Sequence, residues 1–192
     1  MKKCYPTLGA RTKTRCPEGT QVVHPAGKMD RRAERSGVQE ELKNVPGIKF
    51  VDHVAIAVKQ GELEGQVRAY ERLGFREIHR EEVRGTDQVR EALLKIGEGP
   101  NLIQLLEPLS ADSPVQKLID RNDGRGGLAH VAFRVESAQR AFDAMRADGF
   151  QLIDEAPRRG SRGTRVFFVH PKSRADSAFG FLIEMVEDPE DK

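Results

Sequence analysis

The chain has 192 residues, of which 38% are hydrophobic and 32% charged, and its formal net charge is +2. This length accommodates one ordinary domain or two small fused halves, and the composition is typical of a globular protein with a modest core. The net charge is too small to indicate a nucleic-acid or membrane partner, and no apolar run approaches the ~18 residues that a membrane span needs. Both cysteines lie near the N-terminus and no signal-peptide pattern follows Met1, so a reducing cytoplasm is the expected location.

The N-terminal segment has a composition of its own. Residues 1–48 contain ten Lys and Arg against five Asp and Glu, with scattered Pro and Gly and no sustained hydrophobic periodicity. Such a segment cannot bury enough apolar surface to fold, which predicts a disordered basic tail over residues 1–46. Its Cys4, Cys16 and His24 fit no zinc-site spacing. If part of this segment does not belong to the natural protein, Met29 is the start we would expect.

Residues 47–109 follow the order strand, helix, strand, strand, strand. Runs of alternating or β-branched apolar residues predict strands over residues 49–59, 75–83, 89–96 and 102–106. After the first strand, Leu63, Val67, Tyr70 and Leu73 recur at helical spacing, and Gly74 is a helix stop.

A connector over residues 110–126 separates this unit from a second one. It contains Ser113-Pro114, a favourable helix start, followed by a short amphipathic stretch. The order of the first unit then returns, with a helix over residues 138–147 and strands over residues 128–135, 150–153, 165–169 and 181–186. A loop rich in Gly and Arg is expected over residues 158–163.

The two units are related by nearly constant offsets. His53 and His130 are 77 residues apart, and Gln104 and Glu184 are 80 residues apart. This spacing indicates a duplication and predicts an α+β fold of two tandem βαβββ modules. Module one spans residues 47–109 and module two residues 127–188, within one domain over residues 47–188. Each module would leave one sheet face uncovered, so the curled mixed sheets can enclose a shared cleft.

Four polar residues interrupt the apolar first and last strands of the two modules: His53, Gln104, His130 and Glu184. Any one of them alone is more often a satisfied core or surface residue, but four at matched positions are hard to explain by chance. A buried carboxylate is costly unless it is paired or bound to metal. Two imidazoles, an amide oxygen and a carboxylate suit a divalent first-row metal in octahedral geometry with two positions open.

Eight motifs occur in order along residues 50–188. They are Asp52-His-Val-Ala-Ile-Ala-Val58, His79-Arg-Glu-Glu82, Val89-Arg-Glu-Ala-Leu-Leu94, Gln104-Leu-Leu-Glu-Pro108, Asp112-Ser-Pro114, Pro157-Arg-Arg-Gly160, His170-Pro-Lys172 and Leu182-Ile-Glu184. Each motif is weak alone. Together they resemble the vicinal oxygen chelate superfamily of glyoxalase, bleomycin resistance and dioxygenase proteins, and within it the methylmalonyl-CoA epimerases.

The resemblance implies a fold and a chemistry. In this family, paired βαβββ modules form one metal-binding cup, whose ligand positions fall here on His53, Gln104, His130 and Glu184. One divalent ion is expected, Co2+ first, with Mn2+, Ni2+ or Zn2+ as alternatives, in a homodimer that acts on an acyl-CoA thioester. The expected reaction interconverts the C2 epimers of methylmalonyl-CoA through an enolate, a step of propionate metabolism.

Two carboxylates are implied as the groups that move the C2 proton, Glu91 and Glu184. Inversion requires proton removal on one face of C2 and delivery on the other, which two carboxylates on opposite sides can perform. Without the resemblance, Glu91 would be taken for a solvent-exposed strand residue. Alternation predicts that it shares a face with Val89 and Leu93.

The phosphates of CoA need cationic or backbone donors. The expected substrate-binding residues are Arg159 and Lys172, with Ser161 as a donor to the substrate carboxylate; further cations near the expected mouth are Arg158, Arg162 and Arg174. Each of these cations could instead be ordinary surface charge.

Departures from the family pattern keep alternatives open. Ala129 stands where the family has a second histidine, and the loop over residues 173–179 is longer than usual. A paralogue acting on another 2-substituted malonyl thioester is one alternative, and a non-catalytic binding or resistance module of the same fold is another. A sibling lyase or dioxygenase is disfavoured by Gln104.

Overall fold

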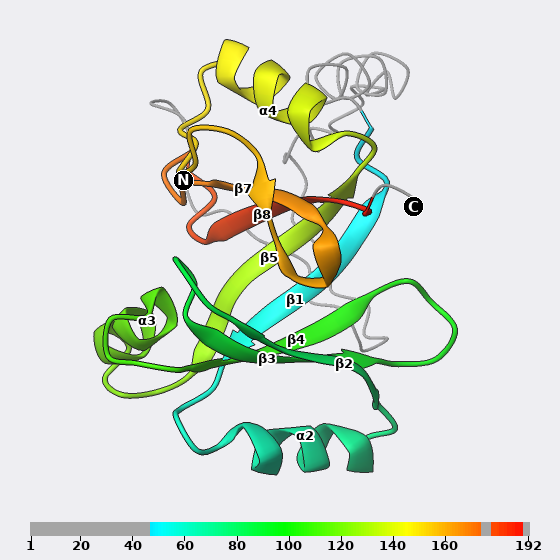
Figure 1. The fold of residues 1–192 in the computed structure, drawn as a ribbon, viewed down its shortest axis with the longest axis vertical. Coiled ribbons are helices and arrows are strands. Elements are labelled where there is room, and N and C mark those ends of the chain that lie inside the picture. The colour runs from blue at the N-terminus through cyan, green and yellow to red at the C-terminus, as the bar shows by residue number, and fades with distance from the viewer. Residues whose placement is uncertain (1–46, 174–177, 190–192) are drawn as a thin grey trace, which may run out of the picture.

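A computed structural model describes residues 47–173 and 178–189 of the chain. The predicted tail over residues 1–46 lies outside these residues, as does Arg174. None of the described helices is long and apolar enough to cross a membrane. In chain order (Figure 1), the elements are β1 (Phe50–Ala57), α2 (Leu63–Arg72), β2 (Arg76–Val83), β3 (Val89–Lys95), β4 (Leu102–Pro108), α3 (Pro114–Arg121), β5 (Gly127–Val135), α4 (Ala138–Ala147), β6 (Arg158–Arg159), a 3₁₀ turn (Ser161–Gly163), β7 (Arg165–Val169) and β8 (Leu182–Glu187).

The strands form one eight-stranded sheet in the order β2-β3-β4-β1-β5-β8-β7-β6. Within each half, the first strand pairs in parallel with the last, β1 with β4 and β5 with β8. The other pairs are antiparallel, including β1 with β5, which joins the halves at the centre. The predicted α+β fold of two βαβββ modules is therefore confirmed, with the two curled sheets continuous through β1 and β5.

Side-chain alternation gives each half of the sheet a face covered by a helix and a concave face. In module one, Val67 of α2 belongs to the same buried cluster as Leu105 of β4. In module two, the rings of Phe142 on α4 and Phe167 on β7 meet edge to face, with centroids 5.2 Å apart. Figure 1 shows α2 and α4 at opposite ends of the molecule, outside the curled sheet. The strand residues that alternate with these core positions line the concave face, which we call the cup.

Two helix starts follow the sequence signals. The Ser113 side chain accepts a hydrogen bond from the backbone N–H of Val115 at 3.2 Å, so α3 begins at Pro114 as predicted. The Ser137 hydroxyl accepts from the backbone N–H of Arg140 at 3.3 Å at the start of α4. Both are ordinary N-caps, which satisfy a backbone donor that has no partner within its own helix.

The prediction of a strand over residues 150–153 is wrong. Only Leu152 pairs there, in an isolated bridge with Val169. The ladder breaks at the next step because the carboxylate of Asp154 replaces a backbone carbonyl and accepts the N–H of Phe168 at 2.7 Å. Pro157 then removes a backbone donor, and pairing resumes at Arg158–Arg159, inside the segment predicted as a loop.

Candidate metal centre and proton-transfer site

A His-Val-Ala sequence occurs once in each module and sets the geometry of the site. The antiparallel register of β1 and β5 pairs His53 with Ala132 and Ala55 with His130. Each histidine therefore lies beside the alanine of the other copy, and alternation turns both imidazoles into the cup. Both alanines are fully buried, and their small side chains leave room between the imidazoles.

The last strand of each module supplies a further polar side chain next to these alanines. Gln104 on β4 pairs with Ala55, and Glu184 on β8 pairs with Ala132. The same duplicated register thus places all four predicted ligand residues on neighbouring positions of four adjacent strands. They share the concave face of the sheet, at the junction of the modules.

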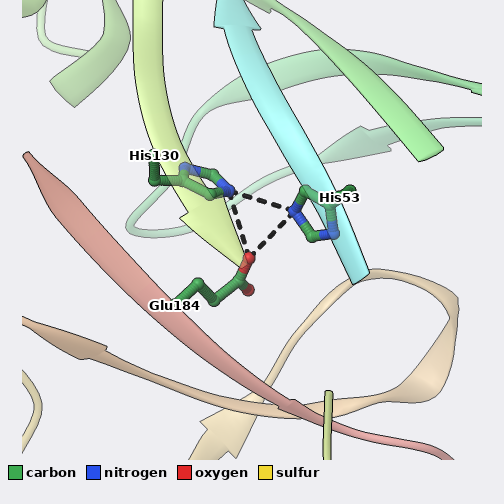
Figure 2. A group of neighbouring side chains, drawn as sticks. All are labelled: His53, His130 and Glu184. Carbon is green, nitrogen blue, oxygen red and sulfur yellow. Dashed lines mark hydrogen bonds and ion pairs between the residues drawn. The ribbon is translucent and has the colours of Figure 1, made fainter. Parts of the chain in front are cut away.

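Two imidazoles and one carboxylate converge in a buried group (Figure 2). The Nε2 atoms of His53 and His130 are 3.1 Å apart, and each is 3.1 Å from Oε2 of Glu184. The exposed fractions of the three residues are 3%, 6% and 8% in the order His53, His130, Glu184. Three potential ligand atoms this close, away from solvent, form a candidate site for a divalent cation.

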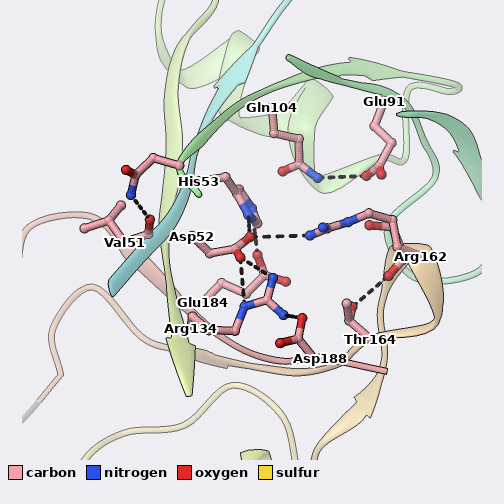
Figure 3. Close-up of polar contacts among 12 residues, drawn as sticks. Val51, Asp52, His53, Glu91, Gln104, Arg134, Arg162, Thr164, Glu184 and Asp188 are labelled. Atoms are coloured by element: carbon pink, nitrogen blue, oxygen red, sulfur yellow. Dashed lines mark hydrogen bonds and ion pairs between the residues drawn. The ribbon is translucent and has the colours of Figure 1, made fainter. Parts of the chain in front are cut away.

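Gln104 and Glu91 form a buried pair beside this group (Figure 3). The Gln104 amide nitrogen donates to Oε2 of Glu91 at 2.8 Å, which orients the amide. Its carbonyl oxygen, Oε1, is buried and has no hydrogen-bond partner among the described residues. A buried acceptor without a partner is costly, and a metal ion would satisfy it. The three converging atoms and this unpartnered oxygen are the kinds of donor that a divalent ion takes.

Asp52 contacts the imidazole of His53 on the side away from the ligand group. Sequence reasoning missed this role of Asp52. It lies at an interruption of the β1–β5 ladder, where a bulge brings its side chain to the same side as that of His53. Oδ1 of Asp52 is 2.7 Å from Nδ1 of His53, so this nitrogen carries the hydrogen and Nε2 faces the group in Figure 2. Oδ2 accepts from Arg134, through Nε at 2.9 Å and through Nη2.

Arg134 is the second residue that sequence reasoning missed. Its guanidinium is almost fully buried and also donates to Asp188 on the far side. The buried charge of Asp52 is therefore compensated by an arginine of the other module. A signal was available here, because alternation along β5 puts Arg134 on the same face as His130 and Ala132.

The buried group is strongly coupled electrostatically. Burial opposes the charged form of His53, but hydrogen bonds to Asp52 and Glu184 raise its pKa to about 9. Burial likewise opposes ionisation of Glu184, yet its contacts with His130 and His53 lower its pKa below the usual range. Without metal, the carboxylate is thus ionised and shares at least one imidazole proton.

This coupling predicts that metal binding releases a proton. Because the pKa of His53 is about 9 in the metal-free protein, its imidazole is protonated near pH 7, and coordination through Nε2 requires the proton to leave. Near pH 7 we expect about one proton released per ion bound, and an affinity that rises with pH and levels off above the histidine pKa. Calorimetry in two buffers of different ionisation enthalpy measures the release. Equal heats in both buffers would contradict this assignment.

Glu91 is buried, with an exposed fraction of 2%. Burial raises its pKa; the nearby Ser161 hydroxyl opposes this, and the charge of Glu81 adds to it. Glu81 lies directly opposite Glu91 across the β2–β3 ladder. A buried carboxyl with a raised pKa in a concave site is a candidate group for proton transfer.

A cavity of about 1390 Å³ lies between residues of β2 and the segment from Pro157 to Arg165. Of the two cations predicted to bind substrate, Arg159 lines this cavity, whereas Lys172 lies in the turn after β7 and does not line it. Ser161 lies in the 3₁₀ turn close to Glu91. The cavity is lined by His79, Glu81, Pro157, Arg158, Arg159, Arg162, Gly163, Thr164, Arg165, Asp188 and Pro189.

Comparisons with known proteins agree with this geometry. The profile of the Glyoxalase/Bleomycin resistance protein/Dioxygenase superfamily matches residues 52–168. An uncharacterised protein of Bacillus subtilis, YqjC, is 32% identical over 143 residues, which cover 74% of this chain and 94% of that protein. A crystal structure of methylmalonyl-CoA epimerase from Mycobacterium tuberculosis superposes with a TM-score of 0.67 at 32% identity, covering 76% of this chain and 91% of that one. A variant of the Streptomyces coelicolor methylmalonyl-CoA epimerase, solved with 2-nitronate-propionyl-CoA, has a TM-score of 0.66 at 33% identity, covering 74% and 99%.

Proposed function

The chain belongs to the Glyoxalase/Bleomycin resistance protein/Dioxygenase superfamily, and we propose that it is a metal-dependent epimerase that inverts C2 of methylmalonyl-CoA. Its similarity to methylmalonyl-CoA epimerases, at about one third identity, supports this choice within the superfamily. The observation that carries the proposal is the buried Gln104–Glu91 pair. A binding module needs no buried, proton-accepting carboxylate beside its metal ligands, whereas an epimerase does.

The proposed ligands of the ion are His53, Gln104, His130 and Glu184, and Co2+ is the ion we propose first, ahead of Mn2+, Ni2+ or Zn2+. A bound divalent ion would supply stabilisation for the negative charge that develops on the thioester oxygen when C2 loses its proton. Asp52 keeps the Nε2 atom of His53 directed toward the site.

The proton transfers are assigned to two carboxylates. The C2 proton lies between a thioester and a carboxylate and is only weakly acidic, so a positioned base is needed. Glu91, with a pKa raised by burial, would serve one face of C2. Glu184 would serve the other face, in addition to its place among the ligands. The Ser161 hydroxyl would donate to the substrate carboxylate and hold the acyl group between them.

Hydrogen exchange at C2 tests this proposal. Each epimer of methylmalonyl-CoA is incubated in heavy water with the metal-loaded protein, and deuterium uptake and configuration are followed together. We expect both uptake and inversion, and their loss after the metal is removed with a chelator. Tight binding of the thioester with neither exchange nor inversion would point instead to the non-catalytic binding module.

A related thioester is the second candidate, favoured by Ala129. This residue packs against the apolar cluster that contains Val89 and Leu106, and a histidine there would take more space. The smaller side chain would give room to a longer 2-substituent. Comparing kcat/KM for ethylmalonyl-CoA and methylmalonyl-CoA decides between the two substrates.

A further inference from the structure

Several arginines of module two surround the cup, and two of them are already committed to carboxylates. Arg134 donates to Asp52 and Asp188. Arg158 donates to both oxygens of Asp87, at 3.0 and 2.9 Å, and to Asp154 at 3.0 Å. These two guanidinium groups hold the protein's own carboxylates, so neither has spare capacity for the acyl end of a ligand.

Arg162 differs from them. It lies in the 3₁₀ turn with a φ of 56°, and its backbone N–H donates to Oε2 of Glu81 in module one at 3.1 Å. Figure 3 shows its side chain directed toward Asp52, below the Gln104–Glu91 pair in that view. The side chain makes one long contact, from Nη2 to Oδ1 of Asp52 at 3.4 Å. Its Nε is buried and has no hydrogen-bond partner within the described part of the chain.

The long contact is also the weakest of those at Asp52. Oδ1 already meets Nδ1 of His53 at 2.7 Å, and Oδ2 is taken by Arg134. Losing the contact with Arg162 would therefore cost Asp52 little. Meanwhile Nε and Nη2 form one edge of the Arg162 guanidinium, which is the edge that binds a carboxylate with two parallel hydrogen bonds. A buried guanidinium donor without a partner favours such a ligand strongly.

The position of Arg162 fits an acyl-carboxylate contact. It lines the large cavity with Arg159 and His79, and it also touches the aspartate that holds His53. Arg162 therefore connects the cavity with the aspartate behind the ligand group. The charge next to the reacting carbon of a malonyl thioester is a free carboxylate.

We propose that Arg162 is a specificity-determining residue that binds the free carboxylate of the acyl group through Nε and Nη2, and so selects malonyl-type thioesters over simple acyl thioesters. The carboxylate replaces Asp52 as the partner of Nη2, and Asp52 keeps its contacts with His53 and Arg134. This inference rests on the proposed function, because it takes the substrate to be a 2-substituted malonyl thioester.

The test compares two ligands that differ in the carboxylate. Dissociation constants for methylmalonyl-CoA and propionyl-CoA are measured by calorimetry on the metal-loaded wild type, Arg162→Met and Arg162→Lys. We expect Arg162→Met to weaken methylmalonyl-CoA about 10- to 100-fold while propionyl-CoA changes less than about threefold. Arg162→Lys keeps the charge but loses the two parallel hydrogen bonds, so we expect an intermediate loss of affinity for methylmalonyl-CoA. If the methionine variant does not fold, the lysine variant alone provides the test.

Arg165→Met is the matched control. Arg165 is exposed and lines the same cavity, so its removal changes the cavity charge equally but should leave the ratio of the two dissociation constants unaltered. If Arg162→Met keeps the wild-type ratio, or weakens both ligands alike with loss of bound metal, Arg162 only supports the fold and the inference is overturned. If the wild type itself does not prefer methylmalonyl-CoA, the proposed function fails instead.

Discussion

Glu91→Gln should lower the rate of inversion by about 10² to 10⁴, the usual cost of losing a positioned general base. The amide keeps the shape and the buried position of the carboxylate but cannot carry the proton. Metal content should stay the same, because Glu91 contacts Gln104 by accepting a hydrogen bond from its amide nitrogen. The Oε1 atom of Gln104, the proposed ligand atom, makes no hydrogen bond with Glu91. Rates from a coupled assay and metal content from elemental analysis of the same sample test both statements.

The two-carboxylate scheme makes a sharper prediction for this variant. Exchange with solvent should persist on the face that Glu184 serves, while inversion slows by the factor given above. One epimer would then take up deuterium at C2 without being converted, and the other would do neither. Equal uptake from both epimers would argue for a single mobile base.

Glu81→Gln is the control that separates loss of proton transfer from loss of a negative charge near the site. Glu81 lies directly opposite Glu91 across the β2–β3 ladder but is half-exposed at the cavity wall. Its amide can still accept the backbone N–H of Arg162, so we expect less than about a tenfold change in rate. Wild-type inversion by Glu91→Gln would rule out the role of Glu91, and equal losses in both variants would reduce it to an electrostatic effect.

Much of this site could be predicted because it repeats. Strand alternation fixed the concave faces of β1 and β5, and the constant offset between the modules matched His53 with His130 and Gln104 with Glu184. The hydrophobic pattern did not predict which strands of the two modules pair with each other. That β1 and β5 join the halves into one sheet is a non-local pairing, which local periodicity does not encode.

The residues behind the ligands show where sequence reasoning fails. Alternation puts Asp52 and His53 on opposite faces, and only the bulge in β1 brings them together. The prediction of a strand over residues 150–153 failed for a related reason. The side chain of Asp154, rather than a backbone carbonyl, accepts the N–H of Phe168. Arg158 was placed only among the cations near the expected mouth, yet it pairs with Asp87, which is 71 positions away. Contacts between loops of different modules leave no trace in periodicity.

His130→Ala should remove the metal. The histidine supplies one of the three converging ligand atoms, and its Nε2 is 3.1 Å from both partners. We expect the affinity for Co2+ to fall by at least about 100-fold, since losing even an outer-shell partner of a ligand costs 10- to 100-fold. Inversion should become undetectable at ion concentrations that saturate the wild type. Competition with a chelator of known affinity measures the first effect.

The stability of the variant gives an independent readout. An ion that binds only the folded state at 100 times its dissociation constant adds about 2.7 kcal/mol to the free energy of unfolding. Adding Co2+ should therefore raise the unfolding midpoint of the wild type and leave that of His130→Ala unchanged. His170→Ala is the matched control, because His170 lies in the turn after β7, where its Nδ1 accepts the backbone N–H of Lys172. It should keep both the ion and the shift. A full equivalent of bound ion in His130→Ala, or a lost ion in His170→Ala, would refute the assignment of the site.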